Sequence, residues 1–298
     1  MIFLPMDIDK VLLNTRLCYA VLGINKKQFD ILLPTFTDVW HEHLDRKGRK
    51  RKIGGGSKGN IKEPKKKLFF ILWYAKVYPT YDIAAYVFAS SKSRTQQWGQ
   101  ILLPILEKTL GRNVSLPERR INTPEEFFLL FPGVEEVMID GVERPTVRRK
   151  KAKVQKKEYS GKKKGHTRKN IVVTDRKKKI LVLSPTKNGK VHDKKLLDKS
   201  VLELPECISK IVDTGFQGLQ HIFKNVFIPK KKPRGGELTQ EEKAWNRLIS
   251  SSRIGVEHAI GGMKRFGIAS KIFRGRLGQD DQYMLVSAGL YNLRLMYR

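Results

Sequence analysis

The chain has 298 residues, of which 60 are Lys or Arg and 29 are Asp or Glu, so its formal charge at pH 7 is +31. This charge is far larger than solubility requires and predicts a polyanionic partner. Apolar residues make up 40% of the sequence, which excludes a disordered basic tail and predicts a folded chain with one large domain or two unequal ones.

Two cysteines, Cys18 and Cys207, stand far apart and belong to no CxxC motif. They support neither a disulfide framework nor a zinc site, and a reducing compartment is the simplest interpretation. The first six residues are apolar and acidic residues follow, without the basic flank or the length of a signal peptide. Because no later stretch reaches membrane-spanning length, we expect a soluble, cytoplasmic protein that does not contact a membrane.

Apolar residues recur at roughly helical spacing over residues 7–46, with Gly23 and Pro34 as breaking points. This pattern predicts two or three short helices. Residues 46–67 are instead rich in Lys, Arg and Gly and include three consecutive glycines at 54–56. Since this segment has no apolar periodicity, we interpret it as a solvated linker or as a basic arm that contacts DNA.

Three helical segments are expected between Lys67 and Leu110. The first ends at Pro79, the second covers residues 81–88, and Ser90 or Ser91 is the expected cap of a third that ends near residue 106. This spacing resembles a helix-turn-helix at about residues 68–106, whose third helix would lie in the DNA major groove. Its early face offers side chains suited to phosphates and base edges, namely Lys92, Ser93, Arg94, Gln96 and Gln97. A small three-helix bundle without a DNA-binding role has the same spacing.

After Pro117 the pattern changes to short apolar runs that are typical of strands. The runs expected to form strands are residues 134–139, 171–174, 180–184, 208–212 and 226–228, and a helical tail is expected from about Gln240. The sequence therefore predicts an all-α region over residues 1–117 and an α/β domain over residues 118–298.

Two acidic residues directly follow apolar strands and precede glycine-containing turns: Asp140 before Gly141, and Asp213 before Thr214-Gly215. Functional sites collect at strand ends in α/β sheets. A third acid, Glu257, lies in the predicted C-terminal helix, which could bring its side chain against the sheet. Each acid alone is also compatible with a turn residue or a surface charge.

Three converging carboxylates repel one another, and divalent cations relieve that repulsion. Magnesium and manganese prefer oxygen ligands, so two Asp and one Glu match these ions better than zinc. A basic tract follows Asp140, because residues 148–169 hold twelve Lys or Arg among twenty-two. We interpret this tract, including Lys162, Lys163 and Lys164, as a contact to the DNA backbone rather than only as a solvated surface.

These motifs resemble the DDE transposases of the insertion-sequence group five type, which are related to the Harbinger-like endonucleases. The resembling segments are Leu72–Asp82 with Phe88–Ser90 and Trp98, Ile139–Gly141, Tyr159–Lys164, His192-Asp193 and Asp213–Gly218. In a third block, this family carries Tyr, Arg, Glu and Lys with two, three and six intervening residues. Arg253, Glu257 and Lys264 fit those intervals, whereas Ser250 stands at the Tyr position.

The resemblance implies an RNase H-like catalytic domain preceded by a helix-turn-helix DNA-binding domain. It implies that Asp140, Asp213 and Glu257 are the catalytic residues and bind magnesium or manganese, as two ions. Arg253 and Lys264 would hold DNA phosphates. His192-Asp193 either supports the first carboxylate or, through Asp193, caps the helix that follows.

The activity that the resemblance implies is that of a DNA transposase, which binds terminal inverted repeats and catalyses metal-dependent strand cleavage and strand transfer. Its partners would be double-stranded DNA, at the transposon ends and the target, and further copies of the chain in a homodimer or higher oligomer. A nucleoid-associated location in a bacterial host follows. Two alternatives stay open: an endonuclease of the same fold that does not join ends, and a domesticated relative that only binds DNA, which the Ser250 departure favours.

Overall fold

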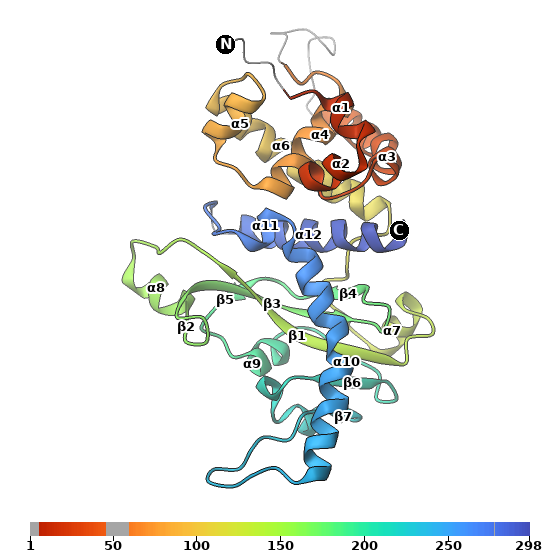
Figure 1. Ribbon diagram of the computed structural model, residues 1–298, viewed down its shortest axis with the longest axis vertical. Coiled ribbons are helices and arrows are strands. Elements are labelled where there is room, and N and C mark those ends of the chain that lie inside the picture. The colour runs from red at the N-terminus through yellow and green to blue at the C-terminus, as the bar shows by residue number, and fades with distance from the viewer. Residues whose placement is uncertain (1–5, 46–59, 277) are drawn as a thin grey trace. The chain divides into compact units, whose positions relative to one another are not determined.

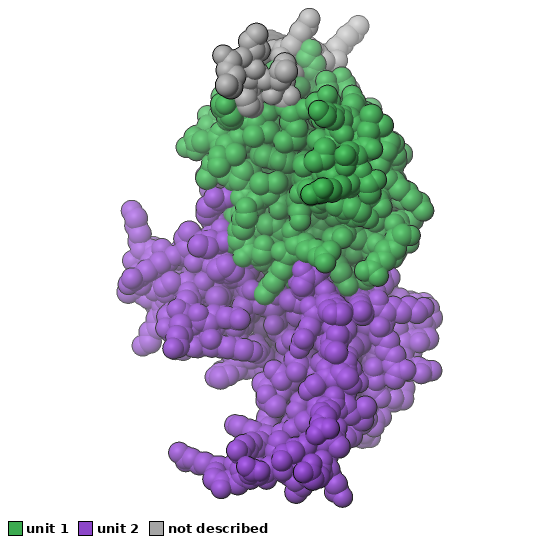
Figure 2. Space-filling view, in the orientation of Figure 1, with its two compact units in different colours: residues 1–116, 263–271, 282–298 green, residues 117–262, 272–281 purple. Residues whose placement is uncertain are grey.

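The computed structural model describes residues 6–45, 60–276 and 278–298. They form two compact units, one from the described residues within 1–116, 263–271 and 282–298, and one from those within 117–262 and 272–281 (Figure 2). Of the predicted linker or DNA-contacting arm at residues 46–67, residues 46–59 lie outside the described part. Among the helices that are described, none combines the length and apolar character needed to cross a membrane.

The first unit is helical (Figure 1). Its helices are α1 (Ile8–Leu13), α2 (Thr15–Leu22), α3 (Lys26–Asp45), α4 (Pro64–Val77), α5 (Tyr81–Val87), α6 (Lys92–Arg112), α11 (Gly267–Ser270) and most of α12 (Gln279–Met296). The rings of Tyr78 and Tyr283 meet at 5.7 Å between centroids, and Asn292 donates to the Ser115 carbonyl. Through such contacts the unit takes in C-terminal residues that the sequence pattern assigned to the second domain.

Local sequence explains where the helices of this unit begin and end. Thr80 and Ser91 cap α5 and α6, each accepting a hydrogen bond from the amide three residues on, so Ser91 rather than Ser90 is the cap. Gly23 ends α2 with a φ of 79°, a left-handed conformation that glycine adopts without strain. The three helices expected between residues 67 and 110 are confirmed, and α6 runs on to Arg112.

Pro34 does not break the chain as predicted, because it lies inside α3. The side chains of Phe29, Leu32, Phe36 and Val39, on either side of it, are buried. Proline removes one backbone hydrogen bond and crowds the preceding turn. The apolar packing of this face outweighs that loss, so the helix continues through the proline.

The second unit is a mixed α/β fold around a seven-stranded sheet (Figure 1). Its strands are β1 (Glu136–Pro145), β2 (Tyr159–Ser160), β3 (Gly165–Thr174), β4 (Ile180–Leu183), β5 (Lys187–Asn188), β6 (Ser209–Val212) and β7 (Val226–Phe227). Its helices are α7 (Pro124–Leu130), α8 (Ala152–Glu158), α9 (Asp193–Asp198) and most of α10 (Gln240–Lys264), with the 3-10 turns η1 (Thr214–Phe216) and η2 (Leu219–His221).

β1 is the central strand of this sheet. It pairs antiparallel with β3 and parallel with β6, β3 pairs antiparallel with β4, and β6 pairs parallel with β7. The five predicted strands are confirmed, but β1 and β3 are longer than expected. The two strands pair from Met138 with Thr174 to Pro145 with Thr167, which extends β1 past Asp140 and starts β3 inside the basic tract.

The two faces of β1 have different neighbours. Val137 and Ile139 belong to a buried core that also contains side chains of α7, α9, η1 and η2. Met138, one position out of phase, faces α10, because a side chain on Gly255 would come within 3.0 Å of its sulfur. By the same alternation Asp140 lies on the α10 face and Gly141 on the opposite face.

Candidate active site

Asp140 and Asp213 are brought together by the register of β1 and β6. The last pair of this parallel ladder is Ile139 with Val212, so each acid is the next residue on its strand. The sequence predicted that the strand would end at Asp140. Instead, β1 continues past Asp140 in its pairing with β3. The chain after β6 does turn away at this point, into η1. Both carboxylates therefore lie where the parallel pairing stops.

Helix α10 carries Arg253 and Glu257 one turn apart, and both side chains reach the same place. The guanidinium of Arg253 lies among the three acids. Its Nη1 donates to Asp213 Oδ1 at 3.1 Å, and its Nη2 is 3.6 Å from Asp140 Oδ2 and 3.9 Å from Glu257 Oε1. The three acids singled out in the sequence thus surround one positive charge, and Arg253, expected to hold DNA phosphates, contacts carboxylates.

Burial has the largest influence on the pKa of Asp140, whose side chain is 19% exposed. Burial raises the pKa of this carboxyl, and the negative charge of Asp213 acts in the same direction. The Gly141 amide, which donates to Asp140 Oδ1 at 2.7 Å, and the charges of Arg253 and Lys162 act against the rise without cancelling it. Glu257, with a 59% exposed side chain, is the most open of the three acids.

The donor set fits a divalent cation in its chemistry. Three carboxylates supply the oxygen ligands that magnesium and manganese prefer. Across residues 6–45, 60–276 and 278–298, however, no three acidic, histidine or cysteine side chains stand ready to hold a metal ion. The Arg253 guanidinium occupies the space between the acids. A metal ion held by these acids would therefore replace the guanidinium as the cation between them.

Asp193 was singled out in the sequence, but its charged network with Lys169 and Glu143, on the opposite face of the sheet, was not. Lys169 of β3 contacts Glu143 of β1 at 3.2 Å and Asp193 of α9 at 3.1 Å. Burial alone would raise the pKa of Glu143, but hydrogen bonds from Thr167 and Ser160 and the charge of Lys169 lower it overall. The signal for these two partners in the sequence was that a Glu, Glu143, and a Lys, Lys169, each stand near an apolar run that predicts a strand.

Seven of the expected DNA-binding side chains lie at two exposed places. One is the turn between β2 and β3, with Lys162, Lys163 and Lys164. The other is the first two turns of α6 in the helical unit, with Lys92, Arg94, Gln96 and Gln97. Lys92 also pairs with Asp82 at 3.0 Å. Lys264 lies in the last turn of α10, within the helical unit.

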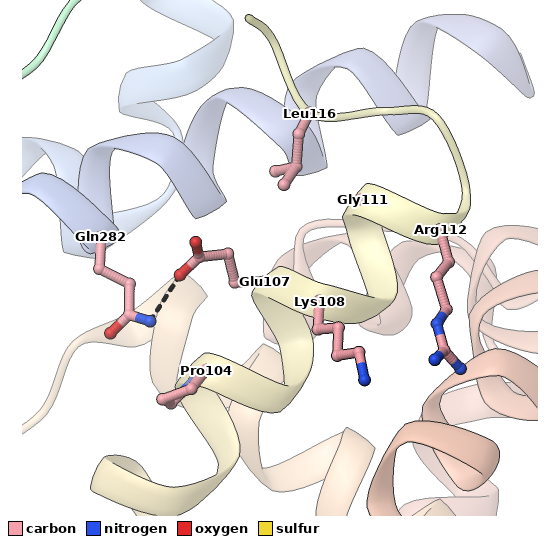
Figure 3. Close-up of a pocket in the computed structure, with 7 residues that line it drawn as sticks. All are labelled: Pro104, Glu107, Lys108, Gly111, Arg112, Leu116 and Gln282. Atoms are coloured by element: carbon pink, nitrogen blue, oxygen red, sulfur yellow. Dashed lines mark hydrogen bonds between the residues drawn. The ribbon is translucent and has the colours of Figure 1, made fainter. Parts of the chain in front are cut away.

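The helical unit has a surface hollow of about 670 Å³ (Figure 3). It is lined by Pro104, Glu107, Lys108, Gly111, Arg112, Leu116 and Gln282. Lys108 and Arg112 both pair with Glu42 of α3, and Gln282 of α12 donates to Glu107. These polar groups therefore hold α3, α6 and α12 together.

Comparison with known proteins concerns the segment that carries Asp140, Asp213 and Glu257. Residues 139–292 match the family described as DDE superfamily endonuclease, a segment that contains Asp140, Asp213 and Glu257. The chain is also 35% identical over 185 residues to a protein of Microchaete diplosiphon named "Probable transposase for insertion sequence element IS702". That match covers 61% of this chain and 66% of the relative, slightly less than two thirds of its length. No solved structure matches the chain.

Proposed function

Because the chain belongs to the DDE superfamily endonucleases, we propose that it is a DNA transposase, which binds terminal inverted repeats and catalyses metal-dependent strand cleavage and strand transfer. Membership of the family indicates DNA cleavage related to transposition, and the transposase relative supports the more specific activity. The observation that carries the proposal is the convergence of Asp140, Asp213 and Glu257 on one cation position.

We assign the second unit to the RNase H-like fold and the first to DNA binding. The mixed sheet supports the first assignment, because the antiparallel strands β4, β3 and β1 are followed by the parallel strands β6 and β7. The succession of α4, α5 and α6 supports a helix-turn-helix, with α6 in the major groove. The exposed polar side chains at the start of α6 would then read base edges and phosphates.

Asp140, Asp213 and Glu257 would hold two magnesium or manganese ions. When bound, such ions supply the Lewis acid that activates water or a DNA 3′-hydroxyl and stabilises the leaving oxygen at phosphorus. Burial disfavours the charged form of Asp140, and a divalent cation would compensate the negative charge of this carboxylate. Arg253, once displaced from the acids, can turn its planar fork of donors to a DNA phosphate, and Lys264 would add a point charge.

The basic tract provides the approach to this site for DNA. Lys162 lies close enough to Asp140 for its charge to lower the pKa of that carboxyl, so the β2–β3 turn and the acids share one surface region. Lys162, Lys163 and Lys164 are exposed and can pair with successive phosphates. The partner would be double-stranded DNA of transposon ends and target, at the nucleoid of a bacterial host, with the protein as a homodimer or higher oligomer because two ends are joined.

A cleavage and joining assay tests this function. The purified protein is incubated with magnesium and the DNA that flanks its own gene, and wild type is compared with Glu257→Gln. Glu241→Gln is a matched control, because Glu241 is exposed in the first turn of the same helix. We expect Glu257→Gln to lose nicked and joined products and Glu241→Gln to keep both.

Other outcomes of this assay separate the alternatives. Cleavage by Glu257→Gln at the wild-type rate contradicts the site. Cleavage without joined products in the wild type indicates an endonuclease that does not transfer strands. Binding without either product indicates a protein that only binds DNA, the outcome that Ser250 in place of the family's Tyr favours.

A further inference from the structure

Asp193 reaches both segments that carry the strand acids, from the face of the sheet opposite α10. Its Oδ1 would lie 2.9 Å from a side-chain carbon on Gly141, and its Oδ2 would lie 3.5 Å from one on Gly215. Gly141 follows Asp140 directly, and Gly215 is two residues after Asp213. The Asp193 carboxylate therefore occupies space that Gly141 leaves open behind the site, and it lies at contact distance from the position of a side chain on Gly215.

Lys169 holds this carboxylate in place. Its ammonium is 3.1 Å from Asp193 Oδ1 and 3.2 Å from Glu143 Oε1, and it donates to the Val191 carbonyl at 3.2 Å. Lys169 is 5% exposed, and it is the cross-strand partner of Glu143 in the β1–β3 ladder. The sheet register thus fixes the ammonium, and buried charges of this kind are costly to leave without a partner.

Helix capping does not account for Asp193. The residue at the cap position of α9 is His192, and its side chain makes no capping hydrogen bond. Asp193 is the first residue of the helix, and its carboxylate is directed to Lys169. The alternative in which Asp193 caps the helix after it is therefore wrong, and its contacts point to the sheet.

Gly141 connects this network to the site. Its amide donates to Asp140 Oδ1 at 2.7 Å, while Asp193 lies on the opposite face of β1, where a side chain at position 141 would project. A displacement of Gly141 would therefore move the Asp140 carboxylate directly. We propose that Asp193, held by Lys169, is a positioning residue that fixes the backbone at Asp140 and Asp213 and keeps their carboxylates at a productive separation. This inference rests on the proposed function of that site.

The kinetic test compares wild type with Asp193→Asn, Lys169→Met and the double variant. Removing a group that orients metal ligands costs about 10- to 100-fold in activity, so we expect kcat for cleavage to fall by that factor with KM and DNA affinity unchanged. The double variant should lose little more than either single variant, because the two residues act as one unit. Asp198→Asn is the control, since Asp198 lies at the other end of α9 and pairs with Lys194 at 3.0 Å.

Hydrogen exchange of the DNA-free protein gives a readout that does not depend on activity. Peptides that cover residues 138–142 and 212–216 should exchange faster in Asp193→Asn and in Lys169→Met than in wild type. Their exchange should be unchanged in Asp198→Asn. If wild type cleaves no DNA but exchange responds in this way, the proposed function fails and the positioning role stands. Unchanged exchange in both segments, or a kcat within twofold of wild type, overturns the positioning role, as does a loss of DNA affinity equal to the loss of kcat.

Discussion

Replacing Gly141 with alanine tests how tightly Asp193 packs behind the site. The new Cβ would lie 2.9 Å from Asp193 Oδ1 and 3.0 Å from its Cγ, whereas ordinary contacts begin at 3.4 Å, so β1 or Asp193 must move by about 0.5 Å. Overpacking of this kind costs about 1–3 kcal/mol, and the lower entropy of the unfolded alanine chain offsets ~0.4–1 kcal/mol. The net loss is then about 0–2.6 kcal/mol, with a midpoint of about 1.3 kcal/mol, which for a unit of this size lowers Tm by roughly 3–5 °C.

Thermal unfolding of three further variants identifies the cause of that loss. Gly261→Ala is the matched control, because nothing lies within 4 Å of its new Cβ and it sits in α10, where alanine should stabilise the helix by up to about 1 kcal/mol. Asp193→Ala removes Cγ and both carboxylate oxygens, the atoms that an alanine at position 141 would meet. In that background Gly141→Ala should cost little. If its effect on Tm is the same with and without Asp193, the packing argument is refuted.

Three other predictions concern separate parts of the chain. Asp140→Asn should abolish magnesium-dependent cleavage while leaving DNA affinity, measured by fluorescence anisotropy, within about twofold, because it removes a ligand and not the basic surface; cleavage at the wild-type rate would exclude the residue from the site. Glutamine at all three of Lys162–Lys164 should weaken binding to every DNA sequence and reduce the salt slope of the binding constant by up to about 3, and an unchanged slope would mean a merely solvated turn. Hydrogen bonds from Lys108 and Arg112 lower the pKa of Glu42 from 4.5 to about 2. The two ion pairs of Glu42 therefore stabilise the fold above pH 4.5, and this stabilisation is lost as pH falls through about 2. Glu42→Gln should therefore lower Tm at pH 7 and match wild type near pH 2, and a pH-independent difference would contradict the ion pairs as its cause.

Much of the fold could be predicted because local pattern determines it. The apolar runs that became β1, β3, β4, β6 and β7 have the length and composition of strands. Ser91 is a capping residue in front of a helical pattern, and it caps α6. Pro34 failed as a breaking point because the packing of distant helices, which local pattern does not contain, stabilises α3 on both sides of it.

The site could be predicted in part for the same reason. An acid after an apolar strand and before a glycine is a local signal, which is why Asp140 and Asp213 were selected. Their separation depends on the register of β1 with β6, and the position of Arg253 depends on how α10 crosses the sheet. The His192-Asp193 pair drew attention to Asp193, but its contact with Lys169 and, through Lys169, with Glu143 joins three elements, so only the structure reveals the network.

The central claim is that the carboxylates of Asp140, Asp213 and Glu257 bind the catalytic metal. A change of metal preference tests this claim most directly. Thiolate is a softer ligand than carboxylate and binds magnesium poorly, whereas manganese tolerates it better. Asp213→Cys keeps a side chain of similar size at a position that is 30% exposed. Its DNA cleavage is measured with each ion alongside wild type. We expect no cleavage with magnesium and a partial recovery with manganese. Cleavage by Asp213→Cys at the wild-type rate in magnesium would contradict the assignment of the site.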